Sequence, residues 1–576
     1  MKKLFFIKSC IVLFFILCTV TIQAKSNEQK PYTIMIYMNG SDLESEHGLA
    51  TDDLVEIIDS GLDSRNANVL ILTGGAKRWM NDAIPEYECI IWQFADGKLN
   101  EVDNMGKVNM GNPTTLSDFI NFSRKNYPAD KYGLIMWDHG GGSIAGFGHD
   151  EKFADGTLTL LDMQKAFIEA GLEKDKLEFL GFDACLMATV EMAVLASNYS
   201  QVLIASEDLA PGDGWDYRFL SVFNKNPKIS GIEVGKVIVD TFIDFYGQDS
   251  DEILTMSVID LTKVAPVMEA MGDLMSVCKI SIHDRKLEWS DFADYRQPTF
   301  HDLAIRRKAT KTFGEGSPRD NYSDMVDIGD MAYQLADLFP KEAATVIRAL
   351  TNCVVYNRHN SDVELHGLST FYIFGGKSQG EFSLDIYSNL DMNKQYTEYL
   401  FAFFEHLKNP QVSANYHTQL ALWQPHQHHN TYRMAGLLQL KNTDNIDIAN
   451  TALEYLWPTL AGEYIAMFPI VTTANMRQYA IPVQINGRDA DIIVAFTPHH
   501  SHGKILGIRN RTGNVIQKGY FPIYLGDKIA VYSLEWNATT NTEDWILGSA
   551  FTVTRLPLHI NWDVAPEGYS VGLRYS

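Results

Sequence analysis

A histidine and a cysteine each follow a strongly apolar segment in this 576-residue chain. His139 lies in YGLIMWDHGGG (132–142), and Cys185 ends LEFLGFDAC (177–185), 46 residues further on. A thiolate is a nucleophile that can attack a carbonyl carbon, and a nearby imidazole can accept and return protons. If the two side chains meet, these residue types favour cleavage of an amide bond through a thioester.

Alternating strands and helices are predicted to position the two side chains. Strand-like apolar runs at 32–40, 67–75, 87–97, 132–142, 176–185 and 201–209 alternate with helical patterns at 49–61, 114–128, 158–172 and 186–199. This alternation predicts right-handed crossovers and an α/β/α sandwich with a mainly parallel sheet over residues 31–225. Because the carboxyl ends of parallel strands share one edge, we expect His139 and Cys185 to emerge side by side.

The residues around this pair suggest how an oxyanion would be stabilised. Attack on a carbonyl creates an oxyanion that needs preorganised donors. The glycine run 140–142 leaves the backbone beside His139 open, so one of its amides could donate. The amide of Cys185, expected near the start of the following helix, would be a second donor. A metal site is the alternative, because Asp138, His149 and Asp150 are close to His139, but no H-E-x-x-H or paired His/Cys spacing is present.

The rest of the chain has a different pattern of apolar residues. Residues 230–410 have more helical spacing and are predicted to complete the first domain, with a late strand at 365–374 that could join its sheet. From 411 to 576, short β-type runs alternate with turn signals, which predicts a separate all-β domain. A chain of this length is too long for one ordinary core.

The N-terminus, cysteine content and charge limit the compartment and the partners. Residues 1–24 have a basic start, an apolar run and Ala24 before a polar segment, which predicts a cleaved signal peptide. The alternative is a membrane anchor, since 4–22 nearly reaches spanning length, but Lys8 interrupts the run. Four cysteines remain after residue 24, too few for a disulfide framework. The net charge of -24 argues against nucleic acid as a partner.

Several segments resemble the clostripain family of cysteine peptidases, in the clan of caspases, gingipains and legumain. These segments are MWDHGGG (136–142), LTLLDMQKAF (158–167), LGFDACLMATVEMA (180–193), ASEDLAPGDGWDY (205–217), MIYMNGSDLE (35–44) and GLSTFYIF (367–374). The resemblance implies a caspase-like fold and a dyad in which His139 is the general acid/base and Cys185 the nucleophile. It implies that the amides of Gly140 and Cys185 form the oxyanion hole.

The resemblance also implies cleavage after arginine or lysine. A buried cationic side chain needs a carboxylate partner. Asp183 is the first candidate because it lies two residues before Cys185 on the same strand face, and Asp213 is the second. Glu207 and Asp208 are weaker alternatives.

Members of this family are typically activated by self-cleavage between the histidine and cysteine strands. Lys152, in the loop GHDEKFADG (148–156), is the predicted site, and Lys165 and Lys174 are expected to be less accessible. Some relatives need calcium, and the acidic segment 41–46 could offer oxygen ligands, although it has no EF-hand-like spacing. No other cofactor is implied.

The leading hypothesis is therefore a secreted, periplasmic or cell-surface cysteine endopeptidase acting on proteins or peptides with basic residues. One alternative is a secreted binding or adhesion protein with a degenerate peptidase fold. Another is a transpeptidase that uses the same two residues, since amines can capture thioesters. The C-terminal β domain could bind a surface, a glycan or the peptidase itself, and its partner stays open.

Overall fold

The computed structural model describes most of the chain after residue 28. The described residues are 29–247, 253–283, 300–314, 324–374, 380–407, 418–425, 431–439, 456–472, 476–497, 503–512, 515–516, 519–537, 542–564 and 569–575. The predicted signal peptide, residues 1–24, and the predicted boundary between 410 and 411 lie outside them. In the described part of the chain, no helix combines the length and apolar character needed to cross a bilayer.

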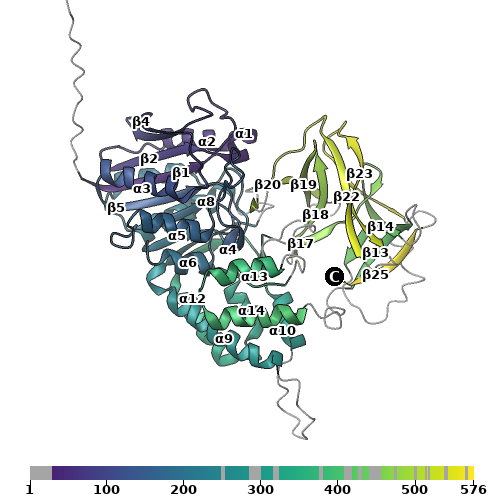
Figure 1. Ribbon diagram of the computed structural model, residues 1–576. Helices are drawn as coiled ribbons and strands as arrows, with labels where there is room; N and C mark the ends of the chain where they lie inside the picture. The colour runs from purple at the N-terminus through teal and green to yellow at the C-terminus, as the bar shows by residue number, and fades with distance from the viewer. Residues whose placement is uncertain are drawn as a thin grey trace, which may run out of the picture.

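A nine-stranded mixed sheet forms the centre of the N-terminal half (Figure 1). In spatial order its strands are β11 (Val354–His359), β8 (Thr255–Asp260), β7 (Val202–Ala205), β6 (Phe179–Asp183), β5 (Ala129–Trp137), β1 (Lys30–Asn39), β2 (Ala67–Gly74), β3 (Cys89–Ala95) and β4 (Lys98–Gly106). The strands from β7 to β2 pair in parallel, which confirms the predicted α/β class. Both edges are antiparallel.

The edge hairpin β3–β4 was not predicted, because β4 has the sequence of a solvated strand. β4 reads KLNEVDNMG and has no buried residue, whereas every residue of the parallel strand β2 is buried. Parallel strands covered on both faces read as apolar runs, so apolar periodicity finds them and misses a polar edge strand.

Helices cover both faces of the sheet (Figure 1). They are α1 (Ser41–His47), α2 (Leu49–Asp59), α3 (Pro113–Asn126), α4 (Gly142–Ala145), α5 (Leu160–Glu169), α6 (Val190–Ala196), α7 (Val222–Lys225) and α8 (Gly231–Tyr246), with a 3₁₀ turn η1 (Tyr217–Ser221). α3 packs on α5 and α5 on α6, whereas α2 and α8 both pack on η1. The two groups lie on opposite faces, as right-handed crossovers in opposite directions require.

The described residues between 253 and 407, here called the helical extension, continue the same hydrophobic core. They add the edge strands β8 and β11, a 3₁₀ turn η2 (Leu261–Lys263) and the helices α9 (Ala265–His283), α10 (Phe300–Ala309), α11 (Ile328–Leu335), α12 (Pro340–Cys353), α13 (Gly380–Asn389) and α14 (Lys394–Leu407). A small antiparallel sheet contains β9 (Thr312–Phe313), β10 (Met325–Asp327) and β12 (Ser369–Phe371). The predicted boundary between 229 and 230 stays a prediction.

The late strand expected in the main sheet lies elsewhere. Only Ser369–Phe371 of the expected strand form β12, which pairs with β10, and the amide of Ser369 donates to the carbonyl of Ala188 at 2.9 Å. The segment is therefore hydrogen-bonded to the loop before α6, a partner 181 residues away.

Glu191, in α6, fastens this extension to the sheet. Its carboxylate is fully buried and accepts hydrogen bonds from Ser143 at 2.7 Å, Thr370 at 2.7 Å and Tyr387 at 3.2 Å. These donors come from α4, β12 and α13, so one side chain joins three elements near the His139 and Cys185 loops.

Replacing Glu191 with alanine is expected to lower the free energy of unfolding by about 3 kcal/mol or more, because several buried donors lose their acceptor. Urea denaturation measures this change. Glu191→Gln is the matched control: it keeps one acceptor oxygen, and its amide can donate to the Ser143 hydroxyl, so its loss should be clearly smaller. Equal losses of stability in both variants would show that the Glu191 carboxylate does not hold these three elements together.

The regular elements that the structure describes after residue 417 are all β-strands, as predicted. One large sheet contains β13 (Thr418–Pro425), β14 (Thr431–Gln439), β17 (Phe468–Thr472), β18 (Arg477–Ile485), β19 (Arg488–Phe496), β20 (Lys504–Thr512), β21 (Val515–Ile516), β22 (Lys528–Asn537), β23 (Thr542–Thr552) and β25 (Ser570–Tyr575). A small sheet contains β15 (Leu456–Leu460), β16 (Glu463–Tyr464) and β24 (Ile560–Val564). This part, here called the β domain, has hydrophobic clusters of its own and stands beside the main sheet (Figure 1).

Candidate active site

The strands β5 and β6 bring His139 and Cys185 to one edge of the sheet. The two strands are parallel neighbours, and Trp137 is paired with Asp183 at their carboxyl ends. His139 and Cys185 each follow two residues later. A Cβ on Gly140 would overlap the carbonyl oxygen of Cys185, so the backbone after His139 lies directly against the cysteine. Only glycine permits this approach.

Cys185 lies in a tight turn rather than at a helix start. Its side chain is buried, and the amide of Ala210 donates to Sγ at 3.2 Å. Leu186 has φ 61°, a strained left-handed conformation for a bulky residue of the kind that clusters at functional sites.

The helix expected at 186–199 begins only at Val190, so the expected helix N-terminus beside the thiol is wrong. The reason is local hydrogen bonding. The amide of Leu186 donates to the carbonyl of Asp208, and that of Ala188 donates to Ser206, which holds this segment along the loop after β7.

His139 is held by a carboxylate that comes from the next strand end. Its Nε2 lies 2.8 Å from Oδ1 of Asp42 in α1, and both side chains are buried. Burial alone would raise the pKa of Asp42, but the charge of His139 and the hydrogen bond to it lower the pKa below its usual value. Asp42 is therefore an anion aimed at the imidazole.

A second buried carboxylate, Asp138, ties the strand ends together. It accepts hydrogen bonds from Asn39 Nδ2 at 2.5 Å and from the amides of His139 at 2.7 Å and His149 at 2.6 Å. Burial raises its pKa to about 7 despite these donors. β1 and β5 are thus linked through Asp138, which fixes the backbone that carries His139.

The two predicted substrate-binding aspartates lie in different surroundings. Asp183 is fully buried, and its Oδ2 accepts from the amide of Trp215 and the hydroxyl of Tyr217, both at 3.2 Å. Asp213 is exposed in the loop after β7. Partial burial of Asp52, in α2, raises the pKa of that carboxyl, and the negative charge of Asp213 raises it further. Asp213 therefore places an exposed carboxylate in this loop, close enough to Asp52 for their charges to interact.

The weaker candidates, Glu207 and Asp208, face the helical extension. Glu207 is buried and accepts from the amide of Gly367 at 2.8 Å, and burial, then the charge of Asp327, raise its pKa well above the usual range. Asp208 accepts from the amide of Gly314 at 2.9 Å. The structure thus gives both residues partners in the extension.

Lys152 lies in the loop between the histidine strand and α5, as expected. It is half-buried, and its Nζ donates to the carbonyl of Glu86 at 2.6 Å. The expectation that Lys165 and Lys174 are less accessible is wrong, because both side chains are exposed. Lys165 lies inside α5, so its backbone is helical although its side chain is free to reach solvent.

The acidic segment proposed as a calcium ligand is a helix whose carboxylates contact protein groups. Asp42 contacts His139, Glu44 accepts from the Thr51 hydroxyl at 2.6 Å, and Glu46 pairs with an arginine of the β domain. Among the described residues, no group of three or more His, Cys, Asp or Glu side chains is arranged to hold a metal ion.

Sequence reasoning missed the role of Asp42, which it treated only as a member of the acidic segment. The available signal was its position: it follows the first parallel strand by three residues, at the same edge as His139. Like His139 and Cys185, Asp42 follows a buried parallel strand within three residues.

The model of the clostripain family (Peptidase_C11) matches residues 36–423. Clostripain from Hathewaya histolytica is 28% identical over 228 residues, a match that covers 34% of this chain and 43% of that protein. The chain thus matches less than half the length of that relative.

Two solved structures are also similar. A structure of a secreted C11 cysteine protease from Bacteroides thetaiotaomicron is 16% identical with a TM-score of 0.47, covering 64% of this chain and 98% of that one. A structure of an inactive zymogen C11 protease from Parabacteroides distasonis is 20% identical with a TM-score of 0.45, covering 64% and 98%. The family match extends over more than half of the chain and includes both strand ends, so this chain belongs to the clostripain family of cysteine peptidases.

Proposed function

We propose that this chain is a cysteine endopeptidase in which Cys185 is the nucleophile and His139 the general acid/base. The observation that carries this proposal is the contact between the His139–Gly140 backbone and Cys185 on adjacent parallel strands. The test is hydrolysis of an arginyl or lysyl reporter peptide, which the Cys185→Ala variant should no longer catalyse.

The reaction takes two half-steps. The thiol proton passes to the imidazole of His139, and the thiolate attacks the carbonyl carbon of the scissile bond. When the C–N bond breaks, the imidazolium donates its proton to the leaving amine and a thioester remains. The same imidazole then takes a proton from a water molecule, whose oxygen attacks the thioester carbon. When the C–S bond breaks, the acid product leaves and the imidazolium returns the proton to the sulfur.

The surrounding groups support these roles. Because Nε2 of His139 is hydrogen-bonded to Asp42, Nδ1 is the ring nitrogen that accepts the thiol proton and returns it. The amides of Gly140 and Cys185 are the proposed oxyanion donors, and their support is that a Cβ on Gly140 would lie 3.1 Å from the amide nitrogen of Cys185.

We assign the preference for arginine or lysine to Asp183 and Asp213. Their support is negative charge on the strand and loop that flank Cys185. Asp213→Asn is expected to lower kcat/KM for an arginyl substrate by about 10- to 100-fold, because a cation then loses its partner. Its kcat/KM for a matched glutaminyl substrate should stay the same.

Asp118→Asn, an exposed acid on α3, is the control and should change neither substrate. Asp183→Asn is expected to act in the same direction as Asp213→Asn. A uniform loss on both substrates in both variants would remove these carboxylates from specificity and leave them as structural groups.

We propose self-cleavage after Lys152 as the activating step. The support is the position of this lysine in a surface loop that leads away from His139. Intact-mass spectrometry of the purified protein should show a cut between Lys152 and Phe153 that is absent in both Cys185→Ala and Lys152→Ala. Because Lys165 and Lys174 are exposed, their alanine variants are the matched controls and should still be cut. Cleavage that persists in Lys152→Ala would show that the activating cut is made at another residue.

We further propose that residues 1–24 are removed on export and that peptides with basic residues are the substrates. A structure among the similar ones is described as that of a secreted protease, which supports export. The same mass measurement reads the mature N-terminus, expected at Lys25.

A further inference from the structure

The β domain touches the helix that carries Asp42. Phe521 stacks on His47 at the end of α1, with the two rings within 8° of parallel. Burial lowers the pKa of His47 to about 4, so the ring is neutral at neutral pH. Phe521 is only 6% exposed and belongs to the hydrophobic cluster of the sheet domain rather than to that of its own domain. It is therefore an anchor seated in the other part of the molecule.

A second contact lies on the cysteine side. Gly519 (φ 73°) is packed so closely on Gly212 that a Cβ would overlap the Gly212 backbone nitrogen. Gly212 follows Ala210 by two residues, and the Ala210 amide donates to Cys185 Sγ. The three residues 519–521 thus extend from the loop beside the sulfur to the helix beside the imidazole.

This short segment is fixed to the β domain. The amide of Phe521 donates to the carbonyl of Ile508 in β20 at 2.8 Å, and the amide of Ile508 donates back to Phe521 at 2.7 Å. Residues 519–521 must therefore move together with the whole β domain.

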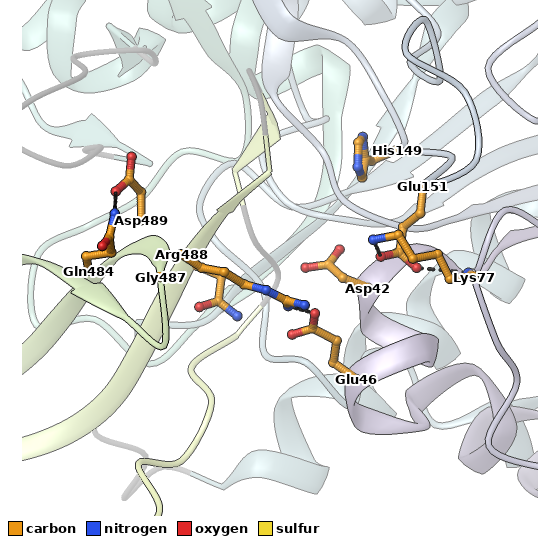
Figure 2. Close-up of a pocket in the computed structure, with 10 residues that line it drawn as sticks. Asp42, Glu46, Lys77, His149, Glu151, Gln484, Gly487, Arg488 and Asp489 are labelled. Atoms are coloured by element: carbon orange, nitrogen blue, oxygen red, sulfur yellow. Dashed lines mark hydrogen bonds and ion pairs between the residues drawn. The ribbon is translucent and has the colours of Figure 1, made fainter. Parts of the chain in front are cut away.

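A third contact comes from the turn between β18 and β19. Arg488, at the start of β19, forms an ion pair with Glu46 in α1 (Figure 2). Between the two parts lies a cavity of about 370 Å³, lined on one side by Asp42, Glu46, Lys77, His149 and Glu151 and on the other by Gln484, Gly487, Arg488, Asp489 and Asn510. This part of the interface is polar and partly hollow, unlike the closely packed core of a permanent interface.

We propose that α1 and the loop 210–214 form a docking surface whose occupant is the segment 519–521 of the same chain, so that the β domain is a built-in inhibitor of the dyad. The inference rests on the proposed function, because what it covers is the proposed dyad. A peptide substrate must lie between the wall beside Cys185 and the wall beside His139, and 519–521 contacts both. His139 and Cys185 are each 0% exposed in this docked arrangement. The peptidase is active only when the β domain has moved away.

The test measures access to the sulfur directly. The full-length protein is treated with iodoacetamide at neutral pH, and the rate of alkylation at Cys185 is followed by peptide mass spectrometry. Phe521→Ala removes the anchor and Arg488→Glu repels Glu46. Each is expected to raise the alkylation rate by roughly tenfold or more, since a docked fraction lowers apparent reactivity in proportion.

Two further variants make the result specific. Tyr524→Ala, an exposed residue three positions after the anchor, should leave the rate unchanged. Arg488→Glu combined with Glu46→Arg should restore the slow rate. Arg488 has an exposed side chain, so its variants test the interface even if Phe521→Ala fails to fold.

Hydrolysis of a lysyl reporter peptide is measured in parallel and separates the two proposals. Faster alkylation together with faster hydrolysis supports both. Faster alkylation without any hydrolysis supports docking and rejects the peptidase proposal. Equal alkylation in wild type, Phe521→Ala and Arg488→Glu overturns the docking inference, whatever the hydrolysis shows.

Discussion

Replacing Cys185 with alanine is expected to abolish hydrolysis of arginyl and lysyl peptides, with a fall in kcat of about 10⁴-fold or more. The reason is that Cys185 supplies the attacking thiolate in the proposed mechanism, and removal of a nucleophile that acts together with its base costs most of the chemical rate. Continuous fluorescence assays on the full-length protein measure it. His139→Ala is expected to cost as much, and the double variant no more than either single one, because the two residues act as a unit.

Cys353→Ala is the matched control. Cys353 is a buried thiol at the end of α12, and burial raises its pKa to about 12, so it carries no thiolate at neutral pH. Its substitution should leave kcat within about twofold, since it only removes a small buried side chain. Residual activity in Cys185→Ala comparable to that in Cys353→Ala would end the proposed mechanism.

Asp42→Asn is expected to lower kcat/KM by roughly 10²- to 10⁴-fold. The carboxylate holds Nε2 of His139, and an amide in its place can present the wrong hydrogen-bonding group and stabilises the imidazolium less. A negative neighbour raises the pKa of a histidine, so its removal lowers that pKa. The limb of the pH profile of kcat/KM that reports the imidazole should therefore move to lower pH.

This shift distinguishes positioning of the imidazole from a general loss of structure. Asp59→Asn, an exposed acid at the end of α2, should change neither the rate nor the profile. Asp42→Glu, which keeps the charge, should recover part of the rate. A uniform loss of rate with an unmoved pH profile would mean that Asp42 serves folding rather than the imidazole.

Two separate devices would keep such an enzyme latent. The loop that carries Lys152 packs on the histidine side, where the amide of Gly148 donates to the carbonyl of His139 at 3.0 Å. The β domain contacts the outer walls of the site through Phe521 and Gly519. Cleavage at Lys152 would release the first and leave the second in place, so alkylation of Cys185 in protein already cut at Lys152 should still be faster in Phe521→Ala.

Part of this molecule was predictable because it depends on neighbours along the chain. Apolar runs bounded by glycines predict strands, and the helical segment between them predicts a parallel crossover. Those local patterns were enough to place His139 and Cys185 at one edge and to separate an α/β part from a β part. They were weakest where a segment is polar, as in β4, or is held by distant backbone groups, as at Leu186.

The remaining features are decided by contacts between residues far apart in sequence, which periodicity along the chain does not encode. Asp42 meets His139 across 97 positions, and Phe521 reaches His47 from another domain. Each of these residues is ordinary in its local context: an acid in an acidic helix, and an aromatic between β-type runs. The sequence by itself determined the strand ends and the chemistry they carry. Only the tertiary structure decided which carboxylate faces the imidazole and which segment packs on the loop beside the sulfur, because burial and charge act through space.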